Sequence, residues 1–102
     1  MNTFNDGIPI EVKRKIISVL RALFPNAKII LFGSRANGLY STNSDIDLAL
    51  NDEKPLNRYD VGEAKAMFAE SNIAYQIDIV DLNNISDRLK NIILQEGKEW
   101  KI

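Results

Sequence analysis

The sequence contains no cysteine and no histidine, and it has few prolines, glycines and aromatic residues. The absence of cysteine excludes disulfide bonds and thiolate metal sites. The absence of histidine removes the commonest general base and the commonest transition-metal ligand. Any metal ion bound by this chain must therefore sit on oxygen ligands, which favours Mg²⁺ or Mn²⁺.

The chain also lacks an excess of charge of either sign. Its net charge is -1, so direct binding of nucleic acid is not expected. It shows no signal-peptide pattern and no apolar run long enough to span a membrane, so we expect a cytoplasmic protein with no membrane contact. A basic cluster of Lys13, Arg14, Lys15 and Arg21 is compatible with a solvated helix face or with a docking surface for an acidic partner.

The 102 residues, of which 45% are hydrophobic, are enough for one domain that spans residues 1–102. Apolar periodicity and turn residues predict alternating helices and strands. We expect a loose arm over residues 1–8, a helix from Pro9 that stops at Pro25, a strand at 28–32, a short helix at 35–38, a strand at 45–50, a helix at 58–71, a strand at 74–82 and a helix at 84–96. This order predicts an α/β (α+β) fold, with a small mixed sheet of three to four strands and helices packed mainly on one face.

Gly33 and Ser34 follow the first apolar strand and precede the short predicted helix. A phosphate group needs backbone N–H groups at close range, and Gly33 has no side chain to block that approach. The Ser34 hydroxyl adds a donor, and the helix N-terminus adds a positive dipole. The pair is therefore a candidate phosphate-binding turn, although by itself it is also compatible with a plain turn from strand to helix.

Asp45 and Asp47 open the strand that follows. Residues two apart in a strand point to the same face, with their Cα atoms about 6.6 Å apart. The two carboxylates are then close enough to share or bracket metal ions, whereas without a cation they would repel and one would tend to protonate. The alternative interpretation is an exposed strand edge with two aspartates that bind nothing.

Asp78 interrupts the third apolar strand, where an unpaired carboxylate is costly. Its apolar neighbours point to the other face, so Asp78 can join Asp45 and Asp47 if this strand lies beside theirs. Asp81 has the opposite parity and can join them only if a bulge shifts the register. The alternative for Asp78 is a salt bridge with a lysine or arginine of a helix.

Gly33-Ser34, ten intervening residues and Asp45-Ile46-Asp47 together resemble the signature of the DNA polymerase β-like nucleotidyltransferase superfamily. The local form Gly-Ser-Arg-Ala-x-Gly, followed by Ser-Asp-Ile-Asp-Leu, looks like its minimal branch, the MNT proteins. The core of the resemblance covers residues 28–50, and the length and element order extend it to most of the chain. It implies the nucleotidyltransferase fold and a metal-dependent transfer of AMP from ATP to a hydroxyl group.

The resemblance also implies roles for individual residues. Asp45 and Asp47 would bind the metal ions that carry the triphosphate, and Asp78 would complete the metal site and orient or deprotonate the attacking hydroxyl. Gly33 and Ser34 would hold the β- and γ-phosphates.

The resemblance is less definite about the roles of Arg35 and Asn37. Arg35 would neutralise charge on the leaving pyrophosphate, or would face the surface or a partner. Many minimal members carry a second arginine where this chain has Asn37, which leaves that position without a phosphate role.

MNT proteins are often encoded beside a HEPN-domain toxin, so the resemblance implies an antitoxin that AMPylates a tyrosine of such a partner. Two other hypotheses remain at this stage. The domain is a binding module that neutralises its partner by contact alone, or it is the catalytic subunit of a small-molecule adenylyltransferase that needs a helical partner. The intact set of Asp45, Asp47 and Asp78 favours the enzyme.

Overall fold

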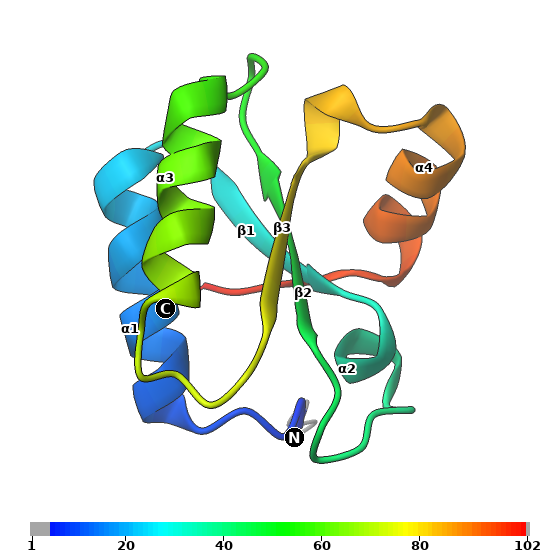
Figure 1. Cartoon of the computed structure of the whole chain (residues 1–102). Helices are drawn as coiled ribbons and strands as arrows, with labels where there is room; N and C mark the ends of the chain where they lie inside the picture. Colours follow the sequence, from blue (N-terminus) through cyan, green and yellow to red (C-terminus); the bar gives the residue numbers. More distant parts are fainter. Residues whose placement is uncertain (1–4, 102) are drawn as a thin grey trace.

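The computed structural model describes residues 5–101 of the chain. Figure 1 shows a small sheet with helices on both sides. No helix within the described range is long and apolar enough to cross a membrane. The elements are α1 (Ile10–Leu23), β1 (Lys28–Phe32), α2 (Ser34–Asn37), β2 (Ile46–Asn51), α3 (Arg58–Ala69), β3 (Ile77–Asp81), the 3₁₀ helix η1 (Leu82–Asn84), α4 (Asp87–Glu96) and β4 (Lys98–Glu99).

The sheet has the strand order β3-β2-β1-β4 and mixes parallel with antiparallel pairs. β1 runs antiparallel to both β2 and β4, while β2 and β3 are parallel. β2 is therefore a central strand, with β1 on one side and β3 on the other. This arrangement confirms the predicted small mixed sheet, and it sets the second and third predicted strands side by side.

One face of the sheet is covered by the two longest helices, α1 and α3, which lie next to each other in Figure 1. Both helices bury an apolar stripe, as their residue spacing predicts. The strands contribute every second residue to the same core, because side chains alternate between the two faces of a sheet. The buried residues shared by these elements include Ile16, Leu20, Leu31, Ile46, Leu48, Leu50, Ala64 and Phe68.

The opposite face is only partly covered. α4 and η1 pack there against a second, smaller group of buried residues, which consists of Ile30, Ala49, Leu82 and Ile93. Asp47 lies two residues before Ala49, and Asp78 lies two residues before Val80, which also packs against this group. By the alternation of side chains, both aspartates therefore belong to the α4 side of the sheet, next to the apolar patch but outside it.

Side-chain caps shift two boundaries from their predicted positions. The Asp81 carboxylate accepts a hydrogen bond from the Asn83 N–H and begins η1 directly after β3. The Ser86 hydroxyl accepts a hydrogen bond from the Leu89 N–H, so α4 begins at Asp87 and not at residue 84. A 3₁₀ turn thus follows β3, and the last α-helix is shorter at its start than predicted.

The chain after α4 returns to the sheet and forms the short strand β4 beside β1. The backbone N–H of Trp100 donates to the Ile29 carbonyl oxygen over 2.8 Å, and the Trp100 side chain is buried in the main core. Trp100 therefore completes the core. The strand itself was not predicted, since two residues are too short to show a period.

The N-terminal arm is not loose over its described part, which corrects the expectation for residues 5–8; residues 1–4 lie outside the described range. Asp6 and Ile8 are both buried. The Asp6 carboxylate accepts a hydrogen bond from the Ile8 N–H over 2.9 Å, which bends the arm before α1. The arm is thereby tied to the body of the protein.

Candidate active site

Asp47 and Asp78 lie opposite each other on the neighbouring parallel strands β2 and β3. Asp47 is half-buried and Asp78 is exposed. The sequence predicted that Asp78 joins the face of Asp45 and Asp47 if the two strands are neighbours, and the strand register brings Asp47 and Asp78 together in this way. The alternative ion pair of Asp78 with a helix lysine or arginine is not found within residues 5–101.

The environment of Asp47 raises the pKa of its carboxyl group above the ordinary value. Burial is the largest cause, because a desolvated carboxylate is less stable than the neutral acid. The negative charges of Asp78 and then of Asp45 add to it, and the protonated Asp47 hydroxyl can donate a hydrogen bond to Asp78. This is the arrangement in which a bound cation would favour the charged form of Asp47.

Asp45 lies directly before β2 and is exposed. Its charge reaches Asp47, as the pKa of that residue shows. Among the described residues, however, no three acidic side chains lie close enough together to surround one metal ion. Asp47 and Asp78 are therefore the close pair, and Asp45 lies beside them, directly before the first residue of β2.

Gly33 brings its backbone directly against the Asp47 carboxylate. Phe32, the last residue of β1, pairs with Asp47 on β2, so the chain turns next to this carboxylate. Gly33 has φ of 75° and ψ of -156°, a conformation open to glycine and strained for other residues. A Cβ atom at this position would lie 2.5 Å from Oδ2 of Asp47. The turn therefore requires glycine for its backbone angles and for the space in front of Asp47.

Ser34 is the first residue of α2, whereas the sequence predicted a short helix that begins one residue later. Gly33 occupies the cap position, and no side chain caps this helix. The Ser34 carbonyl accepts hydrogen bonds from the Gly38 and Leu39 N–H groups, which close the short helix. Its hydroxyl makes no hydrogen bond to another described residue, so it is available to a ligand beside Gly33.

Arg35 lies in a different place from the one that a phosphate contact requires. Its side chain is 1% exposed, and its guanidinium donates to backbone carbonyls of Ser44 at 3.0 Å and Asp6 at 2.9 Å. It also stacks against the rings of Tyr40 and Tyr75. The structure thus turns this side chain into the protein and away from the site.

Sequence reasoning missed the residues that hold Arg35. Asp6, Tyr40 and Tyr75 are scattered along the chain, and backbone carbonyls carry no sequence signal. Asn37, at the position where many minimal members have arginine, uses its side-chain oxygen to accept the Leu39 N–H over 3.0 Å. This contact gives Asn37 a local structural role at the end of α2.

A shallow hollow of about 360 Å³ lies at the outer edge of β3, and Asp78 is part of its wall. Lys65 and Phe68 line it from α3, and Tyr75 lines it from the segment before β3. Of the three aspartates, only Asp78 borders this hollow.

Residues 14–100 match the polymerase beta nucleotidyltransferase family. The chain is 35% identical over 104 residues to a protein adenylyltransferase MntA of Aphanizomenon flos-aquae, covering 91% of this chain and 69% of that protein. Its fold is similar to that of a chain in the crystal structure of a toxin–antitoxin with AMP-PNP. That comparison has a TM-score of 0.72 and 34% identity, and it covers 88% of this chain and 73% of the other.

A similar fold is also found in a structure of the tri-AMPylated Shewanella oneidensis HEPN toxin in complex with an MNT antitoxin. The TM-score is 0.68 and the identity is 29%, over 91% of this chain and 72% of the other.

Proposed function

This chain belongs to the polymerase beta nucleotidyltransferase family, and on that premise we propose that it is a protein adenylyltransferase that inactivates a HEPN-domain toxin. It transfers AMP from ATP to a tyrosine hydroxyl of that partner and so acts as an antitoxin. The observation that carries the proposal is the pair of Asp47 and Asp78 on neighbouring strands, placed against the Gly33 turn.

The acceptor in this proposal comes from the relatives. They include a protein named as a protein adenylyltransferase and a structure that contains an AMPylated HEPN toxin. The chain spans about seven tenths of the length of these proteins. The nucleotide is supported independently by the relative whose structure contains AMP-PNP.

The three aspartates are proposed to bind Mg²⁺ or Mn²⁺. They offer only oxygen ligands, as these ions prefer, and burial together with the charges of Asp78 and Asp45 raises the pKa of Asp47, so a cation there would stabilise its charged form. When bound, the metal ions neutralise the triphosphate and stabilise charge at the reacting phosphorus. Asp45 and Asp47 hold the ions that carry the triphosphate, and Asp78 completes the set.

The backbone of Gly33 and the free hydroxyl of Ser34 are proposed to hold the β- and γ-phosphates. Both residues lie beside Asp47, so phosphates bound there are next to the carboxylates. Arg35 is left out of the nucleotide site, since its guanidinium is buried against carbonyl groups.

The acceptor hydroxyl attacks the α-phosphorus in line with the bond to the leaving pyrophosphate. A bond forms between the hydroxyl oxygen and the α-phosphorus, and the bond from that phosphorus to the bridging oxygen of pyrophosphate breaks. Asp78 orients the hydroxyl and accepts its proton. We place the acceptor tyrosine in the hollow at the edge of β3, because Asp78 forms part of its wall. The reaction needs ATP, so we assign it to the cytoplasm.

The proposal is tested by co-expressing the chain with the HEPN-domain protein of its own genome and weighing that partner by mass spectrometry. The wild type should add one or more AMP units to the partner, and the double variant Asp45→Asn, Asp47→Asn should add none. Asp87→Asn on α4 is the matched control, since it removes an exposed carboxylate outside the site.

If the partner gains no nucleotide mass and the double variant neutralises it fully, the domain acts by contact alone. If AMP appears on a small molecule and not on the partner, the chain is a subunit of a small-molecule enzyme.

A further inference from the structure

The buried guanidinium of Arg35 contacts every segment that carries a part of the proposed site. Arg35 itself lies in α2, one residue after Ser34. Its Nε–H donates to the carbonyl oxygen of Ser44, the residue directly before Asp45, over 3.0 Å. Two longer contacts of 3.4 Å reach the carbonyl oxygens of Ser41 and Thr42 in the same loop.

Arg35 also reaches the segment that leads to Asp78. Its guanidinium carbon lies 5.0 Å from the centre of the Tyr75 ring, and Tyr75 is three residues before Asp78. It also lies 5.1 Å from the centre of the Tyr40 ring. The guanidinium thus contacts two aromatic rings while its N–H groups donate to carbonyl groups, a combination of contacts that a lysine ammonium does not provide.

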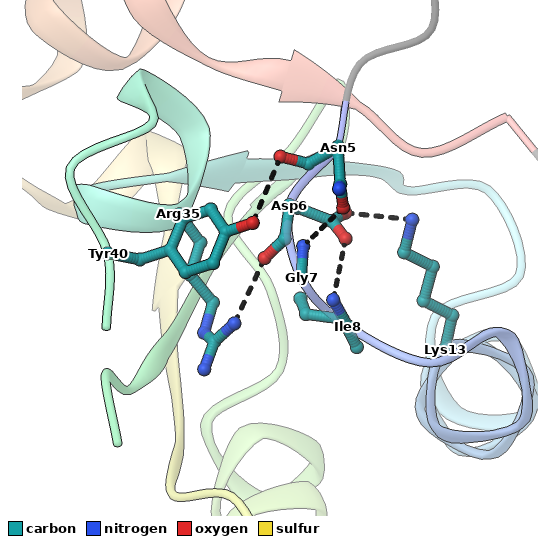
Figure 2. Close-up of polar contacts among 7 residues, drawn as sticks. All are labelled: Asn5, Asp6, Gly7, Ile8, Lys13, Arg35 and Tyr40. Atoms are coloured by element: carbon teal, nitrogen blue, oxygen red, sulfur yellow. Dashed lines mark hydrogen bonds and ion pairs between the residues drawn. The ribbon is translucent and has the colours of Figure 1, made fainter. Parts of the chain in front are cut away.

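The N-terminal arm lies between Arg35 and Tyr40 on one side and Lys13 of α1 on the other, as Figure 2 shows. The Arg35 Nη1–H donates to the Asp6 carbonyl over 2.9 Å, and the Asp6 carboxylate pairs with Lys13 of α1 at 2.8 Å. The Asp6 side chain is 3% exposed. The Tyr40 hydroxyl makes a further contact of 3.5 Å to the Asn5 carbonyl. A strip of the arm is therefore fixed between α1 and the loop that precedes Asp45.

We propose that Arg35, Asp6 and Lys13 form a positioning clasp for the nucleotide site. The clasp fixes the Gly33-Ser34 turn, the loop that ends at Asp45 and the segment before Asp78 relative to one another. Arg35 acts as a positioning residue, because it reaches the site only through the backbone that carries Ser44 and Asp45 and through the ring of Tyr75. The inference rests on the proposed function, since it assigns a task to the clasp only if these residues bind Mg-nucleotide.

The number and kind of Arg35 contacts support a positioning task. A buried cation is costly unless its donors are satisfied, and here the four contacts go to the carbonyls of two separate segments. The loop over residues 38–45 has no regular strand structure to fix it. Within that loop the Ser44 hydroxyl accepts the Ser41 N–H over 2.9 Å. The Arg35 donors therefore add three contacts from α2 to this loop and one from α2 to the arm.

The test measures binding of Mg-AMP-PNP by calorimetry to the wild type and to the variants Arg35→Lys and Lys13→Met. Supporting groups around a metal site typically change metal affinity by about 10- to 100-fold when they are altered. We expect Arg35→Lys to weaken Mg-AMP-PNP binding by at least about 10-fold and Lys13→Met to weaken it less, because Lys13 reaches Arg35 only indirectly, through Asp6. Arg14→Met, on the exposed face of α1, is the matched control and should bind as the wild type does.

Hydrogen exchange on the same proteins separates positioning from general loss of stability. In Arg35→Lys, faster exchange should be confined to residues 5–8, residues 38–45 and the segment around Tyr75 before β3, with α1, α3 and α4 unchanged. Leu20→Ala provides the comparison, because it opens the buried core under α1 without touching the clasp. It should lower thermal stability more than Arg35→Lys while keeping nucleotide affinity in the folded protein.

The outcomes distinguish the clasp from the function on which it rests. If the wild type binds no Mg-AMP-PNP, the proposed function fails. If the wild type binds, Asp47→Asn does not bind and Arg35→Lys binds as tightly as the wild type, the clasp is refuted and the proposed function stands. Should Arg35→Lys fail to fold, weaker binding by folded Lys13→Met still supports the clasp, and wild-type binding by that variant overturns it.

Discussion

The Asp47 side chain fills the space in front of Gly33 that a side chain at that position would need: a Cβ atom on Gly33 would lie 2.5 Å from Oδ2 of Asp47. The contact joins the end of β1 to the second aspartate of the motif. A side chain at position 33 would therefore displace the Asp47 carboxylate or distort the turn.

Gly33→Ala should therefore destabilise the protein and weaken nucleotide binding. Both the positive φ and the contact with Asp47 oppose an added methyl group, and strain of this kind costs about 1–3 kcal/mol. Gly62→Ala is the matched control, because Gly62 lies inside α3 with open space around its Cα. That change should stabilise the protein by about 1 kcal/mol. Chemical unfolding measures both effects, and equal stability of Gly33→Ala and the wild type would contradict the account.

Asp47→Asn should make the metal-free protein more stable while abolishing AMP transfer. The amide carries no charge, so it removes the repulsion from Asp78 and Asp45 and can still donate a hydrogen bond to Asp78. Loss of a carboxylate that holds the metal should lower the rate of AMP transfer at least about 100-fold. Thermal unfolding and mass spectrometry of the partner measure the two effects. A variant that is less stable than the wild type and still transfers AMP would be evidence against this role.

The pKa of Asp47 also predicts how stability and binding depend on pH. Its pKa is higher in the folded than in the unfolded protein, so folding favours the protonated acid. This contribution to stability is complete below the unfolded pKa and is lost as the pH rises through the folded pKa. The stability gained by Asp47→Asn should therefore grow from acidic to neutral pH in the absence of metal.

Binding of Mg²⁺ should show the opposite dependence on pH, since the ion needs the charged carboxylate. Affinity should fall as the pH drops through the raised pKa of Asp47. Calorimetric titration with Mg²⁺ at several pH values tests this, with Asp87→Asn as the control for a carboxylate outside the site. An affinity that stays constant over this range would show that Asp47 does not bind the ion.

Substitution of Asp78 should affect AMP transfer, whereas substitution of Asp81 should affect stability. The Asp81 carboxylate accepts hydrogen bonds from the Leu56 N–H at 2.9 Å and the Asn83 N–H at 3.0 Å. Asp81→Ala leaves these groups unpaired, so it should cost about 1–3 kcal/mol of stability and spare the activity of the folded fraction. Asp78→Asn should keep the fold and lose AMP transfer. The reverse pattern in paired unfolding and transfer assays would reassign the site.

Much of the fold follows from local patterns in the sequence. The apolar run 28–32 became β1 with the predicted bounds, and the alternation after Asp45 became β2. The parity of Asp78 placed it on the correct face, and the strand order then set it opposite Asp47. These features depend on side-chain alternation along single strands, which a sequence displays directly.

The features that sequence reasoning missed depend on contacts between distant segments. The family resemblance gives Arg35 either a phosphate contact or a place at the surface or a partner, whereas its donors are taken by carbonyl groups of Asp6 and Ser44 in the interior. The arm was expected to be loose because it is polar, but Asp6 is buried by its contacts with Lys13 and Arg35. Every residue has a backbone carbonyl, so the sequence does not show which carbonyls accept the Arg35 hydrogen bonds. These contacts could therefore not be predicted from the local sequence.

The central claim is that Asp45, Asp47 and Asp78 hold a metal-bound triphosphate against the Gly33 turn. Anomalous diffraction from a crystal grown with Mn²⁺ and AMP-PNP tests it most directly. The account predicts a manganese peak between Asp47 and Asp78, with the β- and γ-phosphates on the backbone of Gly33 and Ser34. A nucleotide bound elsewhere, or a manganese ion that contacts neither Asp47 nor Asp78, would contradict it.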